Sequence, residues 1–484
     1  MRRTLSLAVV ITALTAVVTP TASAAPDTSP PPVRWGPCEE PVPTILRCAR
    51  VEVPLDYRDP RGRKIQIAIS KLPSTNPERR RGVLLTNPGG PGGAGVAFPA
   101  VFPAARMPQE VLDSYDIIGF DPRGVGLSSP VTCDLTPEQQ ARGNFPPYAR
   151  TDADVTREVG HARPIAAQCA TSATADLLPH ITTANTARDV DRVREALGER
   201  KISYLGYSYG TYLGAVHASL FPDRGDRFVL DSSLGPDGYD VKAMRRFALG
   251  LQDRFPDFAA HAAAHPEYGL GATPEQVTAK FFELAESLDA RPVQGVDGTM
   301  FRGLTFGYLY SDADMPKLAE AWQALESGRP LPEDPPVEGA ENLMAARFHV
   351  VCGDTRWPSS VTTYQRNAAV DRVRYPMLGG STASVNPCAF WPGERVEGPV
   401  RITGRGPANV LISQNERDPG TPLAGAREMR QALGGRAVLV TADQGGHGAY
   451  LFGANKCAND AVTAFLARGE RPSGDLACPA QPAR

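Results

Sequence analysis

The sequence has few features of nucleic-acid-binding or repeat proteins. Its 484 residues include 51 basic and 53 acidic side chains, and they contain no run of more than three basic residues. Affinity for nucleic acid comes largely from Lys and Arg side chains that neutralise phosphates, so a nearly balanced chain is a poor candidate for that class. We also find no internal repeat, which argues against a solenoid.

Long hydrophobic runs are scarce, and the one present lies at the N-terminus. Residues 1–25 have the pattern of a signal peptide: Arg2 and Arg3, then an apolar run over 5–18, then the small residues 22–24. This run is too short for a stable membrane anchor, and no second run of spanning length follows. We therefore expect a secreted, extracellular protein that does not bind a membrane.

Strand and helix patterns alternate over most of the remaining chain. Residues 26–36 are rich in Pro, Ser and Asp and predict a flexible lead. The alternation then predicts an α/β fold with a doubly wound, mostly parallel sheet. Helical patterns without strand signals interrupt it over 234–387. We therefore predict a core in two parts, 37–233 and 388–484, and an inserted helical cap between them.

The strongest strand and helix signals give approximate bounds for the elements. The predicted strands are apolar or alternating runs between turn residues, at 49–53, 65–70, 83–86, 116–120, 202–205, 228–230, 410–413 and 437–440. The predicted helices with the clearest limits are 211–220, 274–290, 315–327 and 422–433. A further helix is expected to begin at the N-cap Asn185 and to stop at Gly198.

Cysteine is sparse too, but its number, eight, is even. No two cysteines form a CxxC or CxxxC pattern, which argues against a zinc site, and we expect no metal and no cofactor. In an exported chain an even count predicts disulfides rather than buried free thiols. Sequence alone does not determine the connectivity, but pairing in chain order closes the shortest loops at the lowest entropic cost. That order is Cys38–Cys48, Cys133–Cys169, Cys352–Cys388 and Cys457–Cys478.

One short motif carries the residues of a nucleophilic turn. The sequence from Gly206 to Gly210 reads GYSYG and fits G-x-S-x-G, between a predicted strand and a predicted helix. A sharp turn there would hold the Ser208 hydroxyl at a helix N-terminus, where the helix dipole favours negative charge. The alternative is a tight structural turn. We predict that Ser208 is a nucleophile.

A serine hydroxyl is a weak nucleophile until a base removes its proton. In α/β-hydrolases the chain order is Ser, then acid, then His. His447 follows the last long predicted strand, and no other histidine lies so late in the chain. We therefore predict that His447 is the base. The weaker alternatives are His217, in the helix after Ser208, and His349, in the predicted cap.

The base also needs a carboxylate that orients its ring. Asp418 is the leading candidate, because it follows a predicted strand and precedes a predicted helix. Asp231, after an earlier core strand, and Asp443, four residues before His447, are the alternatives. Asp418 could instead serve only as an N-cap of the next helix.

Two backbone N–H groups should stabilise the oxyanion. One is that of Tyr209, and the second is expected from Gly89 or Gly90, in the Gly-rich loop 87–93. This loop lacks the GxxxxGK pattern of a phosphate loop. Nearby, Asp121 and Arg123 are expected to form a buried structural pair.

Several motifs together resemble one known family. Residues 87–95, 121–128, 206–210, 418–422 and 446–448 resemble those of secreted actinobacterial tripeptidyl aminopeptidases of the Streptomyces type, in the prolyl-aminopeptidase family of serine peptidases. The resemblance implies an α/β-hydrolase core with a helical cap. It also implies a Ser-His-Asp triad that releases tripeptides, through an acyl-enzyme, from peptides or proteins with free N-termini. We expect a monomer.

The implied specificity requires groups that bind a free amine. A buried ammonium needs carboxylates or carbonyls in place of water. Candidate carboxylates in the cap are Asp312, Asp314, Glu341 and Asp354, although any one of them could equally be a solvated surface group.

Two other functions fit the same motifs. An esterase or lipase would use the same triad, and a binding protein could retain the fold without activity. Reaction with a fluorophosphonate distinguishes a binding protein, which would not react, from a peptidase or an esterase, which would.

Overall fold

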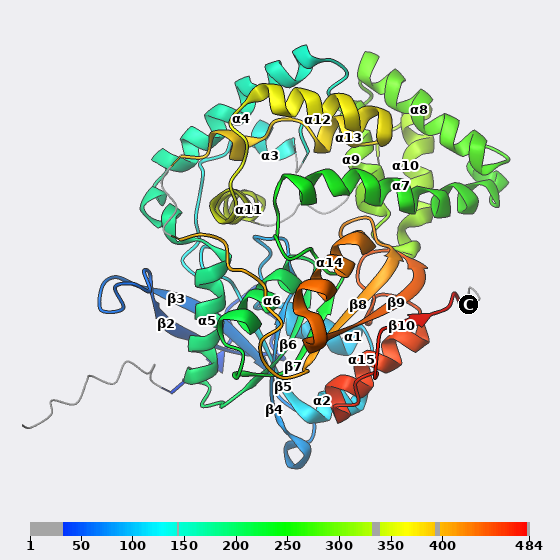
Figure 1. Cartoon of the computed structure of the whole chain (residues 1–484). Helices are drawn as coiled ribbons and strands as arrows, with labels where there is room; N and C mark the ends of the chain where they lie inside the picture. Colours follow the sequence, from blue (N-terminus) through cyan, green and yellow to red (C-terminus); the bar gives the residue numbers. More distant parts are fainter. Residues whose placement is uncertain (1–31, 143–144, 332–338, 393–396, 482–484) are drawn as a thin grey trace, which may run out of the picture.

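A twisted sheet of ten strands lies beneath a layer of helices (Figure 1). The computed structural model describes residues 32–142, 145–331, 339–392 and 397–481. The predicted signal peptide, 1–25, lies outside the described residues. The strands are β1 (Gly36–Pro37), β2 (Arg47–Pro54), β3 (Lys64–Leu72), β4 (Gly82–Asn87), β5 (Tyr115–Phe120), β6 (Ile202–Tyr207), β7 (Gly225–Asp231), β8 (Val410–Arg417), β9 (Ala437–Gly445) and β10 (Leu476–Cys478).

The sheet is mostly parallel, as the strand and helix alternation predicts. Its strand order is β1-β2-β3-β5-β4-β6-β7-β8-β9-β10. The pairs from β5 to β10 are parallel, and the three N-terminal strands add an antiparallel edge. Parallel strands are covered on both faces, because the helices that connect them pack above and below.

Side chains alternate between two buried faces along the central strands. Leu84 packs into one hydrophobic cluster, whereas its neighbours Val83 and Leu85 belong to the other. Period-two alternation with both faces buried produces the continuous apolar runs seen in the sequence. The helices that cover the two faces are α1 (Val101–Ala104), α2 (Gln109–Ser114) and α15 (Lys456–Arg468) on one, and α5 (Thr183–Ala196), α6 (Tyr209–Leu220) and α14 (Leu423–Leu433) on the other.

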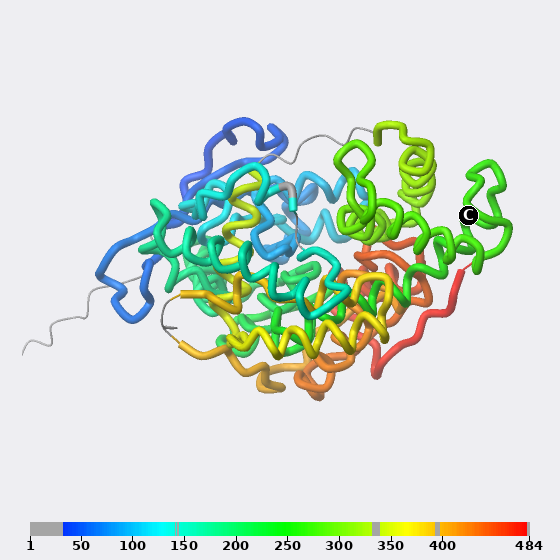
Figure 2. The backbone as a smooth tube through the Cα atoms, turned by 90° about the horizontal axis from the view of Figure 1, so that it is seen from above, coloured from blue at the N-terminus to red at the C-terminus, as the bar shows by residue number. Residues whose placement is uncertain are grey.

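Most of the upper layer comes from the chain between β7 and β8. Its helices are α7 (Val241–Ala263), α8 (Pro274–Ala290), α9 (Gly298–Tyr308), α10 (Met315–Glu326), α11 (Ala340–Asp354), α12 (Val361–Arg374) and α13 (Gly379–Thr382). Two helices from before β6 also lie in this layer, α3 (Pro137–Ala141) and α4 (Asp152–Thr171). Seen from above, α12 runs beside α4 (Figure 2), and the two helices are in contact.

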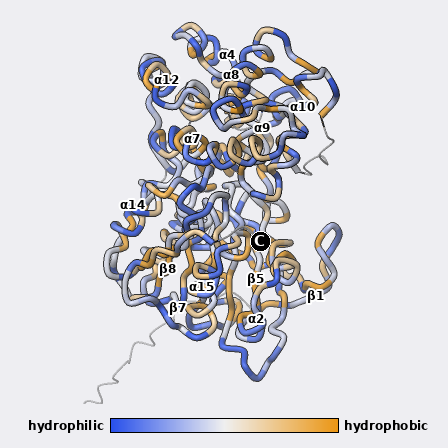
Figure 3. Tube along the Cα trace, turned by 90° about the vertical axis from the view of Figure 1, so that its right-hand side faces the viewer, coloured by the Kyte–Doolittle hydropathy of each residue, from blue (hydrophilic) through white to orange (hydrophobic). Residues whose placement is uncertain are grey.

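The hydropathy of the chain follows this arrangement. In Figure 3 the strands are mostly hydrophobic, and the outer turns are mostly hydrophilic. Among the described residues, no helix combines the length and the apolar character that crossing a membrane requires.

The elements that end beside Ser208 are longer than their patterns predict. β8 continues to Arg417 and β9 to Gly445, so Asp418 and His447 follow directly on strand ends. One cap prediction is wrong: α5 begins at Thr183, and Thr182 is its N-cap because its side chain accepts from the Asn185 N–H. The Asn185 side chain instead donates to the His180 carbonyl.

All eight cysteines form disulfides in chain order, as loop entropy predicts: Cys38–Cys48, Cys133–Cys169, Cys352–Cys388 and Cys457–Cys478. The second bridge joins α4 to the loop before α3, and the third joins α11 to the segment after α13. Disulfides restrict the unfolded chain, so these bridges stabilise the helical layer.

The expected pairing of Asp121 with Arg123 is wrong. Arg123 is fully buried and donates to both oxygens of Asp189, on α5, at 2.6 and 2.7 Å. Asp121 instead accepts from the backbone N–H groups of Gly95, Val96 and Leu127 at 2.8–2.9 Å. Asp121 and Arg123 are only two residues apart, but the chain turns between them, so their side chains bond to different parts of the protein.

Replacing Arg123 by Met should lower the free energy of unfolding by about 3–5 kcal/mol, because Asp189 would keep a buried charge without its partner. Urea unfolding followed by circular dichroism measures the change. The matched control is Arg63→Met, which removes a pair with Asp176 that is 57% exposed on both sides and should change the midpoint little. Similar midpoints for both variants would contradict a structural role for the buried pair.

Candidate active site

Ser208 lies in the sharp turn between β6 and α6, with φ at 56° and ψ at −124°. A positive φ is strained for a residue with a side chain, and such strain is concentrated at functional turns. The flanking glycine is needed for space, since a Cβ on Gly210 would lie 2.8 Å from the Asn87 carbonyl oxygen. The turn therefore presents the Ser208 hydroxyl at the carboxyl edge of the sheet.

Asp418 and His447 form a hydrogen-bonded pair on the loops after β8 and β9. The His447 Nδ1 lies 2.9 Å from Oδ1 and 3.0 Å from Oδ2 of Asp418. Asp418 is 1% exposed, and its carboxylate also accepts from the N–H groups of Gly420 and Thr421 at 2.8 Å. These contacts orient the carboxylate, and its bond to Nδ1 leaves Nε2 of His447 as the ring nitrogen for a reacting group.

The electrostatics of His447 depend on this pair. Burial lowers the pKa of the imidazole, but the negative charge of Asp418 and its hydrogen bond outweigh burial and raise the pKa above its usual value. A base with such a pKa is protonated more readily, which suits a group that takes a proton from serine and later returns it.

The two alternative acids have other partners. Asp231 is fully buried and accepts from the backbone N–H groups of Ala449 and Tyr450 at 2.7 and 2.8 Å. Burial raises its pKa to about 6. Asp231 therefore holds the segment after His447 in place. Asp443 forms an ion pair with Arg417 at 2.6 Å.

The two alternative bases are packed away from Ser208. His217 is 0% exposed in α6 and stacks on Phe228. His349 is also fully buried, and its Nδ1 lies 2.7 Å from the Ala345 carbonyl.

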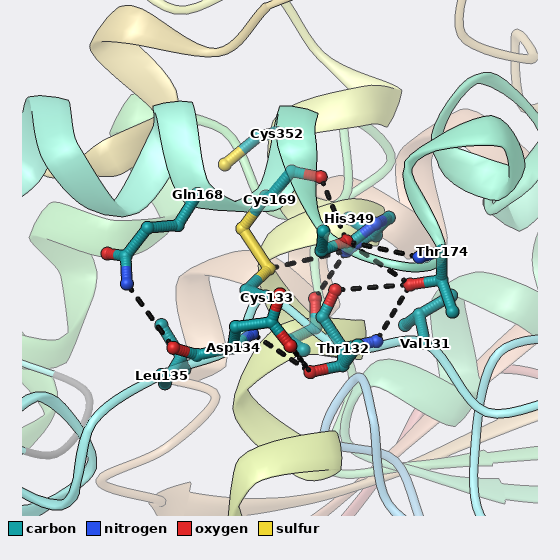
Figure 4. The surroundings of a disulfide bond; sticks show 12 residues. Val131, Thr132, Cys133, Asp134, Leu135, Gln168, Cys169, Thr174, His349 and Cys352 are labelled. Atoms are coloured by element: carbon teal, nitrogen blue, oxygen red, sulfur yellow. Dashed lines mark hydrogen bonds between the residues drawn. A yellow bond between two sulfur atoms is a disulfide. The ribbon is translucent and has the colours of Figure 1, made fainter.

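His349 lies beside a disulfide (Figure 4). Its Nδ1 and the Sγ of Cys133 are 4.0 Å apart, and Cys169 completes a group whose possible ligand atoms lie within 4.8 Å of one another. Both sulfurs belong to the disulfide, so neither is a thiolate, the form in which cysteine binds metal. The group is better explained as packing of α11 against the bridge.

The Gly-rich loop after β4 lies against the Ser208 turn. A Cβ on Gly89 would approach the Ser208 Cβ to 2.9 Å and the Tyr209 nitrogen to 3.1 Å. The Gly89 N–H donates to the Asn87 side chain at 3.0 Å, so it is already engaged. Gly90 lines the same cavity as Ser208. Of the two glycines expected to provide the second oxyanion donor, Gly90 fits better.

Ser208 and His447 line one cavity of about 650 Å³ between the sheet edge and the helical layer. Most of the wall is apolar or aromatic, and four of its rings, Phe145, Phe247, Phe306 and Tyr310, pack edge to face. A cavity of this size and character is typical of a site for a small organic or peptide ligand.

Among the lining residues that were not anticipated from the sequence, three contact Ser208, His447 or Gly90. The Tyr310 ring packs edge-on against His447, with centroids 4.7 Å apart, and its carbonyl accepts the His447 N–H. Burial raises the pKa of Tyr239, although Arg347 and a hydrogen bond with the Ser208 side chain lower it. The Arg347 guanidinium donates to the Gly90 carbonyl at 3.0 Å. None of these residues lies in a recognisable motif, so no sequence signal identified them.

The four carboxylates expected to bind a substrate amine lie elsewhere, and none is among the residues that line the cavity. Asp312 pairs with Arg254, and Asp314 pairs with Lys317. Glu341 accepts from the Cys133 N–H at 2.9 Å, near the start of α11. At the end of that helix, Asp354 accepts from the Thr183 N–H, also at 2.9 Å. Glu341 and Asp354 therefore attach α11 to the core, and Asp312 and Asp314 form ion pairs. This cavity gives the prediction that these carboxylates bind a substrate amine no support.

Similarity to known proteins agrees with this geometry. A family model described as "TAP-like protein" matches residues 375–478, which include Asp418 and His447. The tripeptidyl aminopeptidase of Streptomyces lividans is 35% identical over 458 residues, which cover 90% of this chain and 84% of the relative. The chain belongs to the tripeptidyl aminopeptidase family.

Two further relatives of this chain come from Mycobacterium tuberculosis. Serine protease Hip1 is 29% identical and covers 92% of this chain and 91% of its own length. Carboxylesterase B is 31% identical and covers 93% and 90%, respectively. The parallel sheet and the similarity to these relatives show that the chain is a serine hydrolase with an α/β-hydrolase fold.

In the Ser208→Ala protein, replacing Asp418 by Asn should lower the pKa of His447, since burial would then be opposed only by the charge of Asp231. An NMR titration of the ring protons measures this pKa, with His447→Gln as the assignment control. Asp443→Asn should leave the pKa unchanged, because Asp443 pairs with Arg417. An unchanged pKa in Asp418→Asn would be inconsistent with the observed pair.

Proposed function

We propose that this chain is a secreted serine exopeptidase that releases tripeptides from free N-termini, with Ser208, His447 and Asp418 as its triad. The observation that carries the proposal is the hydrogen bond between Asp418 and His447, whose ring lines the same cavity as Ser208. The 35% identity to a Streptomyces tripeptidyl aminopeptidase supports it. Secretion is supported by the four disulfides and by the signal-like pattern over 1–25.

The reaction begins when Nε2 of His447 takes the Ser208 hydroxyl proton and Oγ attacks the carbonyl carbon of the third peptide bond. The developing oxyanion accepts from the N–H groups of Tyr209 and Gly90. His447 then passes the proton to the departing amine, and the C–N bond breaks to leave a tripeptidyl ester on Ser208.

Water completes the cycle. His447 takes a proton from the water as its oxygen attacks the ester carbonyl, and the proton then returns to the Ser208 oxygen. The tripeptide leaves as a free acid. Asp418 stabilises the imidazolium in both halves and does not itself take the proton.

The adjoining cavity provides a place for the substrate amine. It has about 70 Å³ and shares Arg142, Phe145 and Arg347 with the main cavity. Glu158 lines it and accepts from Arg142 through Oε2 at 2.7 Å. Burial raises the pKa of Glu158, although Arg142 lowers it. We propose that Glu158 binds the substrate amine, because among the described residues no other carboxylate lines either cavity.

Ester hydrolysis is the second candidate. It is favoured by the 31% identity to carboxylesterase B, and the proposed triad would cleave an ester by the same steps. An esterase would not require a free amine, so the two candidates differ in their response to acetylation of the substrate.

Ser208→Ala, Asp418→Ala and His447→Ala should each reduce turnover about a thousandfold or more, without unfolding the protein. Triad losses are not additive, so Ser208→Ala/His447→Ala should be little worse than Ser208→Ala. Hydrolysis of a tripeptidyl nitroanilide measures turnover, with Asp443→Ala as the control. Near-normal turnover in Asp418→Ala, with a large loss in Asp231→Ala, would move the acid role to Asp231.

Acetylation of the substrate amine should lower kcat/KM about tenfold to a hundredfold, because a charge-assisted hydrogen bond is lost. Glu158→Gln should reduce the difference between free and acetylated peptides, and Glu283→Gln, 66% exposed, should leave it unchanged. Liquid chromatography with mass spectrometry identifies the products. Equal cleavage of both peptides, or cuts within long chains, would indicate an endopeptidase or an esterase.

A further inference from the structure

Arg347 places a positive charge on the wall of both cavities. It lies on α11 and lines the main cavity together with Ser208. Its Nη1 donates to the Gly90 carbonyl at 3.0 Å, its Nη2 lies 3.9 Å from the Met244 sulfur, and its guanidinium lies 5.1 Å from the Tyr239 ring centre. All three of these partners are neutral.

The second arginine on the wall differs in this respect. Arg142 forms an ion pair with Glu158 at 2.7 Å. Within the described ranges, Arg347 forms no ion pair, and no carboxylate lines the main cavity. The two cavities therefore hold two guanidinium groups against one described carboxylate.

A cation that has no paired anion on a cavity wall is stabilised by an anion that enters with the ligand. The guanidinium has five N–H donors in a planar arrangement that matches a carboxylate. Its recorded bonds go to the Gly90 carbonyl, the Met244 sulfur and the Tyr239 side chain, and none of these acceptors carries a charge. An incoming ammonium adds further positive charge, so a substrate carboxylate would reduce the excess of positive charge in the site.

We propose that Arg347 forms a subsite for an acidic side chain within the first three residues of the substrate. The inference rests on the proposed peptidase function and names its preferred substrates: peptides with Asp or Glu at the position whose side chain faces Arg347. The aromatic wall receives the neighbouring apolar side chains, and the acidic side chain pairs with the guanidinium.

Pairs of isosteric peptides test this subsite. Glu and Gln are compared at each of the first three positions of an otherwise Ala-based tripeptidyl substrate, and kcat/KM is measured for every peptide. At one position the Glu peptide should be favoured about tenfold or more, and in Arg347→Met that ratio should fall to about one. Arg347→Lys should retain part of the preference, because it keeps the charge but not the planar donors.

The Glu/Gln ratio is the readout, since Arg347 also contacts Gly90 and its loss can slow every substrate alike. The matched control is Arg329→Met, an exposed arginine of the helical layer that bonds to Ser327 and should leave the ratio unchanged. Equal rates for Glu and Gln at all three positions of the unaltered protein would overturn the inference. A preference that persists in Arg347→Met would overturn it too.

Nitrophenyl esters separate this inference from the proposed function. If no peptide is cleaved but esters are, the peptidase proposal fails, and the subsite is tested with the butanoate ester and the singly charged succinate ester. Preference for the succinate ester, lost in Arg347→Met, would support the anion subsite on an esterase. Equal rates for the two esters would overturn the subsite.

Discussion

The strained turn at Ser208 is the constraint on which the site depends. Its positive φ turns the chain from β6 into α6 within one residue, and the packing around the turn leaves no room for a Cβ at Gly206 or Gly210. Gly210 packs on Asn87 and Gly89 packs on Ser208, so the loop 87–93 and the Ser208 turn form one tightly packed unit. Asp418 and His447 reach the same edge because β8 and β9 are parallel to β6 and end there.

One helix of the layer, α11, contacts this unit and the adjoining core along its whole length. Glu341 bonds near its start, Arg347 contacts the Gly90 carbonyl from its middle, and Asp354 bonds to Thr183 at its end. A Cβ on Gly92 would collide with the Leu343 carbonyl, so the helix rests directly on the loop. The helical layer is thus held against the loop 87–93, which lines the same cavity as Ser208.

Sequence patterns predicted the residues whose surroundings are local. Ser208, Asp418 and His447 each follow a strand, and the chain order of the family places them at one sheet edge. The partners of Asp312, Glu341 and Asp354 could not be predicted, because these partners lie far away in the chain. Arg347, Tyr239 and Glu158 line the cavities without belonging to any motif. For the same reason the expected Asp121–Arg123 pair is wrong: the true partner of Arg123, Asp189, is distant in the chain.

The central claim is that Ser208 carries a three-residue acyl group during turnover. A reaction with a tripeptidyl ester, quenched in acid and digested, tests it directly by mass spectrometry of the active-site peptide. The account predicts a mass increase of one tripeptidyl group on the fragment that contains Ser208, absent from Ser208→Ala. Product formation at full rate with no such adduct, or an adduct on another residue, would contradict it.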